Sequence, residues 1–269
     1  GLGGLRAAGG DDERPGLLVG RRAVRVPAAG ARARARAGAR PGRGRHVCQR
    51  DGQRLLRARG VAGATRVAVV TSADIYGPVT EAELPLTEQQ PLRPVSPYAA
   101  SKAAADMLCV QAGLGHGFDV IRIRAFNHLG PGQSDKFVAS ALARRVARAE
   151  RNREAIVRVG NLEARRDFTD VRDVVRAYRA LMVDGCPGQA YNVCSGIDRS
   201  VRELAGILLR TSSADITLET DPELMRPVDL KVLRGDNTKI STDTGWSPNI
   251  PIEQTLEDLL EFWRREDLP

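Results

Sequence analysis

The chain has 269 residues and carries 41 Lys and Arg against 33 Asp and Glu, which gives a net charge of +8. It is long enough to bury one large core or two small ones, and it contains no run of about 18 apolar residues that would predict a transmembrane helix. The first ten residues lack the apolar stretch of a signal peptide, and four scattered cysteines and three histidines predict reduced thiols in a cytoplasmic protein without a metal site.

Residues 1–60 differ in composition from the rest of the chain. They contain 15 Arg and four acidic residues, and Arg, Gly and Ala occupy 39 of the 60 positions. Such a segment buries little apolar surface and cannot offset the entropy lost on ordering. Three interpretations stay open: a basic arm for nucleic acid or acidic partners, a solvated tail, and a GC-rich coding sequence translated in the wrong frame. We favour the wrong frame, expect no nucleic-acid partner, and place the folded domain at 61–269.

From about residue 61, strand-like and helix-like patterns alternate. Short apolar runs predict strands at 67–70, 120–125, 156–159 and 190–193. Caps and apolar periodicity predict helices at 97–111, 137–148, 171–183, 201–209 and 252–264. This alternation predicts an α/β fold with a Rossmann-like, doubly wound, mostly parallel sheet.

The apolar spacing also predicts which helical side chains face the core. In the helix at 137–148 these are Phe137, Val138, Ala141, Leu142 and Val146. In the helix at 252–264 these are Ile252, Leu256, Leu259, Leu260 and Trp263.

Two segments bring a serine, a tyrosine and a lysine into one neighbourhood. The strand at 67–70 leads into Thr71-Ser72-Ala73-Asp74-Ile75-Tyr76-Gly77, and the next helix opens within Ser96-Pro97-Tyr98-Ala99-Ala100-Ser101-Lys102. Tyr98 and Lys102 are four residues apart and share a helix face. A nearby ammonium would lower the pKa of Tyr98, which could then donate a proton to a carbonyl oxygen held by Ser72. The pattern therefore predicts carbonyl reduction with a nicotinamide cofactor, whose ribose Lys102 could reach.

Three further strings make the pattern specific. They are Phe126-Asn127-His128-Leu129-Gly130-Pro131-Gly132-Gln133, Val159-Gly160-Asn161-Leu162-Glu163-Ala164-Arg165-Arg166-Asp167-Phe168-Thr169-Asp170-Val171-Arg172-Asp173 and Tyr191-Asn192-Val193-Cys194-Ser195-Gly196. With the first two segments they resemble the extended short-chain dehydrogenase/reductase family of nucleotide-sugar enzymes, from about Val61 to Arg265. Within that family they are most similar to the GDP-6-deoxy-4-keto-mannose reductases.

The resemblance implies roles for particular residues. Ser72, Tyr98 and Lys102 match the family's catalytic residues, and Tyr98 and Lys102 would also contact NADP or NAD. A second group would hold the diphosphate of a GDP-sugar substrate and consists of Asn127, Arg166 and Arg226. A guanidinium suits this task because it binds phosphate through two parallel hydrogen bonds. The resemblance further implies a small C-terminal substrate lobe and a homodimer that pairs through the helix at 97–111.

Each substrate-side residue also has a purely structural interpretation. Arg166 could pair with Asp167 or Asp170, and Arg226 could be an exposed loop charge. Asn127 could cap the turn before Gly130-Pro131-Gly132. We interpret His128 as a packed neighbour rather than a catalyst, and Phe137 and Val138 border either the base pocket or plain helix core.

Two alternatives to the reductase remain. GDP-mannose 4,6-dehydratases carry threonine at the position of Ser72 and glutamate at that of Asp74, so the shorter carboxylate here leaves dehydration open. The family's glycine-rich phosphate loop, G-x-x-G-x-x-G after a first strand, has no counterpart before Val67. We therefore interpret the N-terminal cofactor-binding part as missing or scrambled, and we predict weak or no nicotinamide binding. The second alternative is thus a cofactor-free remnant that binds a nucleotide sugar.

Overall fold

The structure is a computed structural model that describes residues 66–224 and 231–266. The low-complexity segment at 1–60 and the predicted substrate residue Arg226 both lie outside the described residues.

A three-stranded parallel sheet forms the centre of the first lobe. It contains β1 (Val67–Val70), β2 (Val120–Ala125) and β6 (Ala190–Val193) in the order β1-β2-β6. All three strands have the bounds that their apolar runs predicted. Their branched side chains suit a sheet that is covered on both faces, and Ile121 and Ile123 are fully buried.

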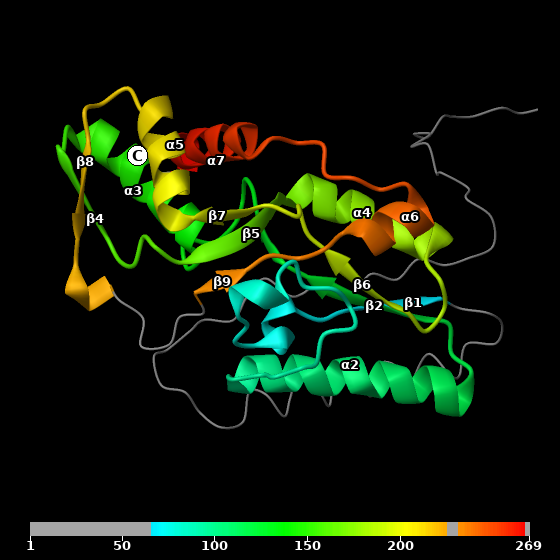
Figure 1. Cartoon of the computed structure of the whole chain (residues 1–269). Coiled ribbons are helices and arrows are strands. Elements are labelled where there is room, and N and C mark those ends of the chain that lie inside the picture. Colours follow the sequence, from blue (N-terminus) through cyan, green and yellow to red (C-terminus); the bar gives the residue numbers. More distant parts are fainter. Residues whose placement is uncertain (1–65, 225–230, 267–269) are drawn as a thin grey trace, which may run out of the picture.

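Helices cover both faces of this sheet, which confirms the doubly wound arrangement (Figure 1). Helix α2 (Pro97–His116) packs on one face, and α4 (Val171–Asp184) and α6 (Thr238–Thr244) pack on the other. Helix α2 begins where predicted but continues beyond residue 111. It ends at Gly117, whose left-handed φ of 67° suits a helix C-terminus.

A second lobe is built from three helices that pack on one another (Figure 1). They are α3 (Val138–Asn152), α5 (Val201–Thr211) and α7 (Ile252–Glu266). A parallel pair of strands, β4 (Ile156–Val159) and β8 (Thr217–Thr220), lies beside them. The buried face of α7 is as predicted at its four aliphatic positions, whereas Trp263 is only partly buried. In α3 the prediction is wrong at Phe137, which precedes the helix and is 56% exposed.

A mixed sheet joins the two lobes and was not predicted. It consists of β3 (Asn127–Leu129), β5 (Arg165–Asp170), β7 (Asp198–Ser200) and β9 (Val232–Leu233). Strand β5 pairs in parallel with β3 and β9 and antiparallel with β7. The sequence of β5 is Arg-Arg-Asp-Phe-Thr-Asp, which has too many charged residues to predict a strand. Its last four residues are nevertheless buried.

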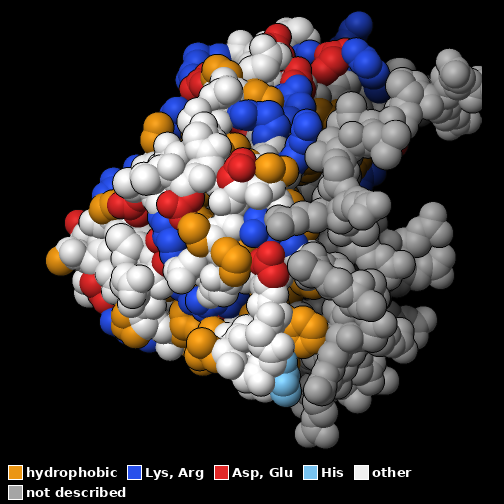
Figure 2. All heavy atoms as spheres, turned by 90° about the vertical axis from the view of Figure 1, so that its right-hand side faces the viewer, with side chains coloured by type: hydrophobic (Ala, Val, Ile, Leu, Met, Phe, Trp, Pro, Cys, Tyr) orange, Lys and Arg blue, Asp and Glu red, His pale blue; other side chains and the backbone are white. Residues whose placement is uncertain are grey.

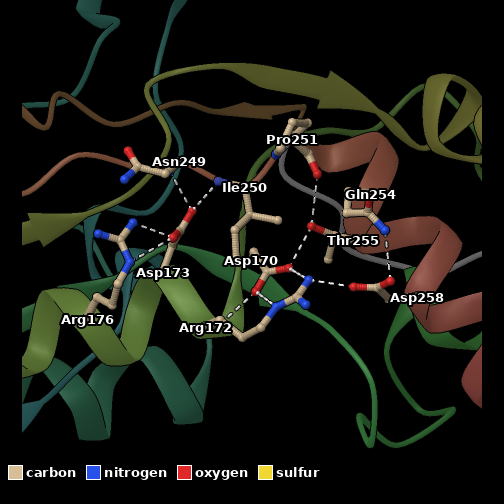
Figure 3. Close-up of polar contacts among 10 residues, drawn as sticks. All are labelled: Asp170, Arg172, Asp173, Arg176, Asn249, Ile250, Pro251, Gln254, Thr255 and Asp258. Atoms are coloured by element: carbon tan, nitrogen blue, oxygen red, sulfur yellow. Dashed lines mark hydrogen bonds and ion pairs between the residues drawn. The ribbon is translucent and has the colours of Figure 1, made fainter.

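Two buried carboxylates at the start of α4 attach the C-terminal segment to this sheet (Figure 3). Asp170 accepts from Arg172 and, at 2.7 Å, from the hydroxyl of Thr255 in α7. Asp173 accepts from the backbone N–H groups of Asn249 at 2.8 Å and Ile250 at 2.9 Å. Residues 249–258 are thereby held against the end of β5.

The surface of the described ranges is mixed in character, and no helix within them is both long and apolar enough to cross a membrane. On the face drawn in Figure 2, the described apolar side chains lie in small groups separated by charged and polar ones. This part of the surface therefore lacks a broad apolar patch of the kind that marks a large interface.

Candidate active site

Ser72 is positioned by the turn that follows β1. It is the N-cap of η1 (Ala73–Tyr76), and its Oγ accepts a hydrogen bond from the N–H of Asp74 at 3.2 Å. The side chain is 9% exposed. Its hydroxyl also lies near enough to the phenol of Tyr98, in a different element, to influence the pKa of that group. The turn thus points a buried hydroxyl beyond the carboxyl end of a central strand, where ligands of parallel sheets bind.

Tyr98 and Lys102 lie in the first turns of α2. Ser96 caps this helix by accepting from the N–H of Ala99 at 3.1 Å, and Pro97 occupies the first helical position. Lys102 Nζ donates to the backbone oxygen of Val70, the last residue of β1, at 3.0 Å. The structure therefore brings Ser72, Tyr98 and Lys102 together around the end of β1, as the spacing predicted.

The electrostatics of Tyr98 differ from the prediction. Burial of the phenol is the largest influence and raises its pKa above the ordinary value of 10.0. The nearby hydroxyl of Ser72 opposes this increase, and the negative charge of Asp74 adds to it. The predicted lowering by Lys102 is wrong for this structure, in which the ammonium donates to a backbone oxygen. A neutral phenol at physiological pH is nevertheless the form that a proton donor needs.

Asp74 and Arg166 connect this group with the second lobe. Asp74 lies in η1 and is partly buried, which raises its pKa, and the positive charge of Arg166 opposes that increase. Arg166 projects from β5 and donates to the backbone oxygen of Arg165 at 2.8 Å. The strand from the second lobe therefore brings a guanidinium within electrostatic reach of the reducing group.

The two carboxylates that could have paired with Arg166 hold other groups. Asp167 is fully buried and accepts from the N–H groups of Ser195, Gly196 and Gly235 and from the Ser195 hydroxyl. Burial raises the pKa of Asp167 to about 6, although these hydrogen bonds oppose the increase. Asp170 holds Arg172 and Thr255, as described above.

The remaining predicted residues lie at the junction of the lobes. Asn127 begins β3, pairs with Phe168 of β5, and has an exposed side chain. His128 is also exposed rather than packed, and its Nδ1 lies 3.2 Å from the backbone oxygen of Phe126. Asn127 and Arg166 thus come from adjacent strands, whereas Arg226 lies outside the described residues.

Sequence reasoning missed several buried polar residues around the site. Asp167 anchors two separate segments beside Arg166, at Ser195–Gly196 and at Gly235, and Arg124 of β2 contacts both Tyr76 and Asp106. A signal for the latter was present, because arginine in an otherwise apolar strand requires buried partners.

The described residues fit the nicotinamide and ribose end of the expected cofactor. Tyr98 is 50% exposed and Lys102 is partly buried, so both side chains border open space at the carboxyl end of β1. Tyr178 of α4 lies near enough for the charge of Tyr98 to influence it, and burial raises its pKa to about 12. The sequence before Val67 lacks the G-x-x-G-x-x-G motif that would hold the adenosine diphosphate end of the cofactor.

Comparison with known proteins identifies relatives of the chain. A curated relative, the GDP-6-deoxy-D-mannose reductase of Pseudomonas aeruginosa, is 41% identical over 209 residues, which cover 77% of this chain and 68% of the relative. The GDP-mannose 4,6-dehydratase of Sinorhizobium fredii is 28% identical, with 79% of this chain and 64% of the relative covered. The chain thus spans about two thirds of the length of these relatives.

Solved structures give the same result. RMD from Pseudomonas aeruginosa complexed with NADPH superposes with a TM-score of 0.75 at 38% identity, covering 80% of this chain and 72% of that one. The UDP-glucose 4-epimerase of Thermus thermophilus in complex with NAD gives a TM-score of 0.69 at 26% identity, covering 79% and 68%. A profile of the GDP-mannose 4,6 dehydratase family matches residues 53–259. On these grounds the chain belongs to the GDP-mannose 4,6 dehydratase family, within the extended short-chain dehydrogenases/reductases.

Proposed function

We propose that the chain is an NAD(P)H-dependent reductase of the C4 ketone of GDP-4-keto-6-deoxy-mannose. The observation that carries the proposal is the grouping of Ser72, Tyr98 and Lys102 at the end of β1. The 41% identity to a GDP-6-deoxy-D-mannose reductase supports this substrate over that of the dehydratases, the first of which is 28% identical. The identity to structures that contain NADPH or NAD supports the cofactor class.

In the proposed reaction the bound nicotinamide supplies a hydride to the C4 carbon. Tyr98 donates its proton to the carbonyl oxygen, and Ser72 hydrogen-bonds that oxygen and fixes its position. Lys102, whose ammonium lies at the end of β1, would contact the ribose of the bound cofactor. Asn127, Arg166 and Arg226 hold the diphosphate, so that the sugar is presented to Tyr98 in a fixed orientation.

The test is oxidation of NADPH followed by its absorbance, with GDP-4-keto-6-deoxy-mannose as substrate. At NADPH concentrations high enough to offset the weak nicotinamide binding predicted from the sequence, we expect substrate-dependent oxidation that is lost in Tyr98→Phe and strongly reduced in Ser72→Ala, with GDP binding retained in both variants. Conversion of GDP-mannose to the 4-keto sugar by the same protein would instead support a dehydratase. Dehydration is the alternative favoured by the carboxylate of Asp74, which lies beside Tyr98.

A second alternative is a remnant that binds a GDP-sugar without a cofactor. The composition of residues 1–60, which contain no G-x-x-G-x-x-G motif, supports it. GDP binding without measurable NADP(H) binding in a calorimeter would favour the remnant, and stoichiometric NADP(H) binding would exclude it. Translating the coding DNA upstream of codon 61 in its other two frames would separate a frame error from a genuine arm, because a frame error should reveal a strand followed by that motif.

We also propose a cytoplasmic homodimer that pairs through α2. Met107 and Leu114 of this helix are 55% and 87% exposed and lie seven residues apart, on one face. Light scattering should give twice the mass of the chain, and Leu114→Glu should reduce it to the monomer. A monomeric unmodified chain would contradict the pairing.

A further inference from the structure

A buried polar network connects the elements that carry the proposed catalytic residues. Its centre is Arg124 in β2, which is 4% exposed, and its neighbours Tyr76 and Asp106 are fully buried. Burying a charge in this way is costly unless every polar group has a partner. Such a group therefore places strict geometric demands on the elements around it.

The guanidinium of Arg124 reaches two elements at once. Its Nε and Nη2 donate to the two carboxylate oxygens of Asp106 in α2, at 3.0 and 3.1 Å. Its Nη1 donates to the hydroxyl of Tyr76 at 3.1 Å and to the backbone oxygen of Glu88 at 2.9 Å. The fixed fork of an arginine makes the first contact two-pronged, which sets orientation as well as distance.

The Tyr76 side of the network ends at Ser72. Tyr76 is the last residue of η1, and Ser72 is the N-cap of the same short helix. The Tyr76 hydroxyl donates to Asn192 Oδ1 at 2.7 Å, and Asn192 in turn donates to the backbone oxygen of Leu86 at 2.8 Å. The Tyr76 hydroxyl therefore accepts from Arg124 and donates to Asn192, which fixes the last residue of η1.

The Asp106 side of the network ends at Tyr98. Tyr98, Lys102 and Asp106 follow one another at four-residue intervals along α2 and thus lie on one face of the helix. The contact between Asp106 and Arg124 fixes the rotation of this face about the helix axis. A second arginine of β2, Arg122, strengthens the contact by donating to Asp106 at 2.7 Å.

We propose that Arg124 is a positioning residue of the reducing centre, which sets the separation between Ser72 and Tyr98 by binding Tyr76 on one side and Asp106 on the other. Its importance for catalysis rests on the proposed reductase function. Arg124 itself does not touch the reacting atoms in this arrangement, because it lies behind η1 and α2. The elements that it joins, η1 with Ser72 and α2 with Tyr98, are held by these bonds without substrate or cofactor.

The test observes Tyr98 directly, so that it does not depend on activity. The chain is labelled with 13C at the tyrosine Cζ, and Tyr98→Phe assigns the resonance of Tyr98 among the four tyrosines. Two variants disturb the network: Tyr76→Phe removes one hydroxyl, and Arg124→Lys keeps the charge but loses the fork. The matched control is Arg66→Lys, because Arg66 is 7% exposed and pairs with Asp119 at the opposite end of β1.

Burial is the main cause of the raised pKa of Tyr98, and a displaced η1 or α2 should expose the phenol to water. We therefore expect the pKa of Tyr98 to fall towards its ordinary value of 10.0 in both network variants. The control should lower the melting temperature without changing the Tyr98 resonance. The proposal is overturned if Tyr76→Phe and Arg124→Lys are destabilised but leave the Tyr98 resonance and pKa as in the unmodified chain. It is also overturned if Arg66→Lys changes them equally.

Turnover gives a second and separate result. In an active protein, Tyr76→Phe should lower kcat by roughly tenfold to a hundredfold, which a displacement of about 1 Å produces, with KM for the sugar unchanged. An unmodified chain without turnover would refute the proposed reductase, whereas the Tyr98 resonance would still decide the role of Arg124.

Discussion

The buried carboxylate of Asp173 offers a quantitative test of how the C-terminal segment is held. Asp173 is fully buried and accepts the N–H groups of Asn249 at 2.8 Å and Ile250 at 2.9 Å, while its other oxygen binds Arg176 (Figure 3). In Asp173→Asn the amide oxygen can accept either from the two N–H groups or from Arg176, but not from both. The amide NH2 then faces the remaining donor and cannot bond to it. Loss of these charge-assisted bonds should cost about 2–4 kcal/mol.

For a domain of this size the cost corresponds to a decrease in melting temperature of roughly 5–15 °C. Urea unfolding can be followed by tryptophan fluorescence, because the buried indole of Trp246 donates to the backbone oxygen of Asp173 at 3.0 Å. The matched control is Asp258→Asn in the same region. Asp258 binds Arg172, but both side chains are partly exposed, so the change should stay within about 1 kcal/mol.

The reasoning would be refuted by a loss of less than about 1 kcal/mol in Asp173→Asn, which is no more than an average substitution costs. It would also be refuted if Asp258→Asn were equally costly, because burial would then not distinguish the two carboxylates.

Three other predictions follow from the site and its surroundings. Arg166→Lys should weaken GDP binding about tenfold in a calorimeter, because lysine cannot make two parallel bonds to phosphate. Arg165→Lys, at the exposed neighbour that pairs with Asp198, should leave GDP binding unchanged. Equal losses in the two variants would contradict the proposed role of Arg166 in holding the diphosphate. Because burial raises the pKa of Tyr98 above 10.0, the rate of carbonyl reduction should not fall through deprotonation of this tyrosine below pH 10. A fall in rate near neutral pH would show that Lys102 lowers the pKa of Tyr98, as the sequence predicted. Gly235→Ala should destabilise the fold by about 1–3 kcal/mol, because the added Cβ would lie 2.6 Å from the sulfur of Cys194. Gly206→Ala lies in a helix, where the added Cβ would meet only the end of the Arg210 side chain at 3.5 Å, and it should stabilise the fold by about 0.5–1 kcal/mol. Thermal unfolding of the two variants checks these opposite signs.

The central strands and most helices could be predicted because their signals are local. The run Val67–Val70 is apolar throughout because both faces of its sheet are covered by helices, so its composition alone indicates a strand. The start of α2 is equally local, since Ser96 and Pro97 cap it. The end of α2 was placed too early because two glycines, Gly113 and Gly115, weaken the helical pattern without ending it.

Strand β5 could not be predicted because its stability comes from distant residues. Asp167 and Asp170 look like surface charges in the sequence, yet both are buried and receive their hydrogen bonds from segments about 30 to 85 residues away. No periodicity within the strand reveals these partners. The exposed position of Phe137, directly before α3, was missed for the same reason, because it depends on contacts between distant segments and not on local periodicity.

The placement of Ser72, Tyr98 and Lys102 could be predicted from the sequence, but their electrostatics could not. A four-residue spacing on a helix places Tyr98 and Lys102 on one face of α2, and Lys102 reaches the backbone oxygen of Val70 at the end of β1. The direction of the Lys102 ammonium depends on the backbone of another element, and the burial of Tyr98 depends on the turn at Ser72. Neither contact can be read from residues 96–102.

The pairing of the central sheet has a consequence for how the chain folds. Val67 pairs with Val120, and Arg122 pairs with Ala190, so neighbouring strands are separated by roughly 50–70 residues and none is joined by a hairpin. Folding rates fall as contacts become more distant in sequence, because loop entropy is lost before the contacts form. The helices should therefore form well ahead of the sheet, and the end of β1, with its reducing group, should be completed late. Recombinant production should accordingly benefit from slow expression at low temperature, which limits aggregation of chains whose strands are still unpaired.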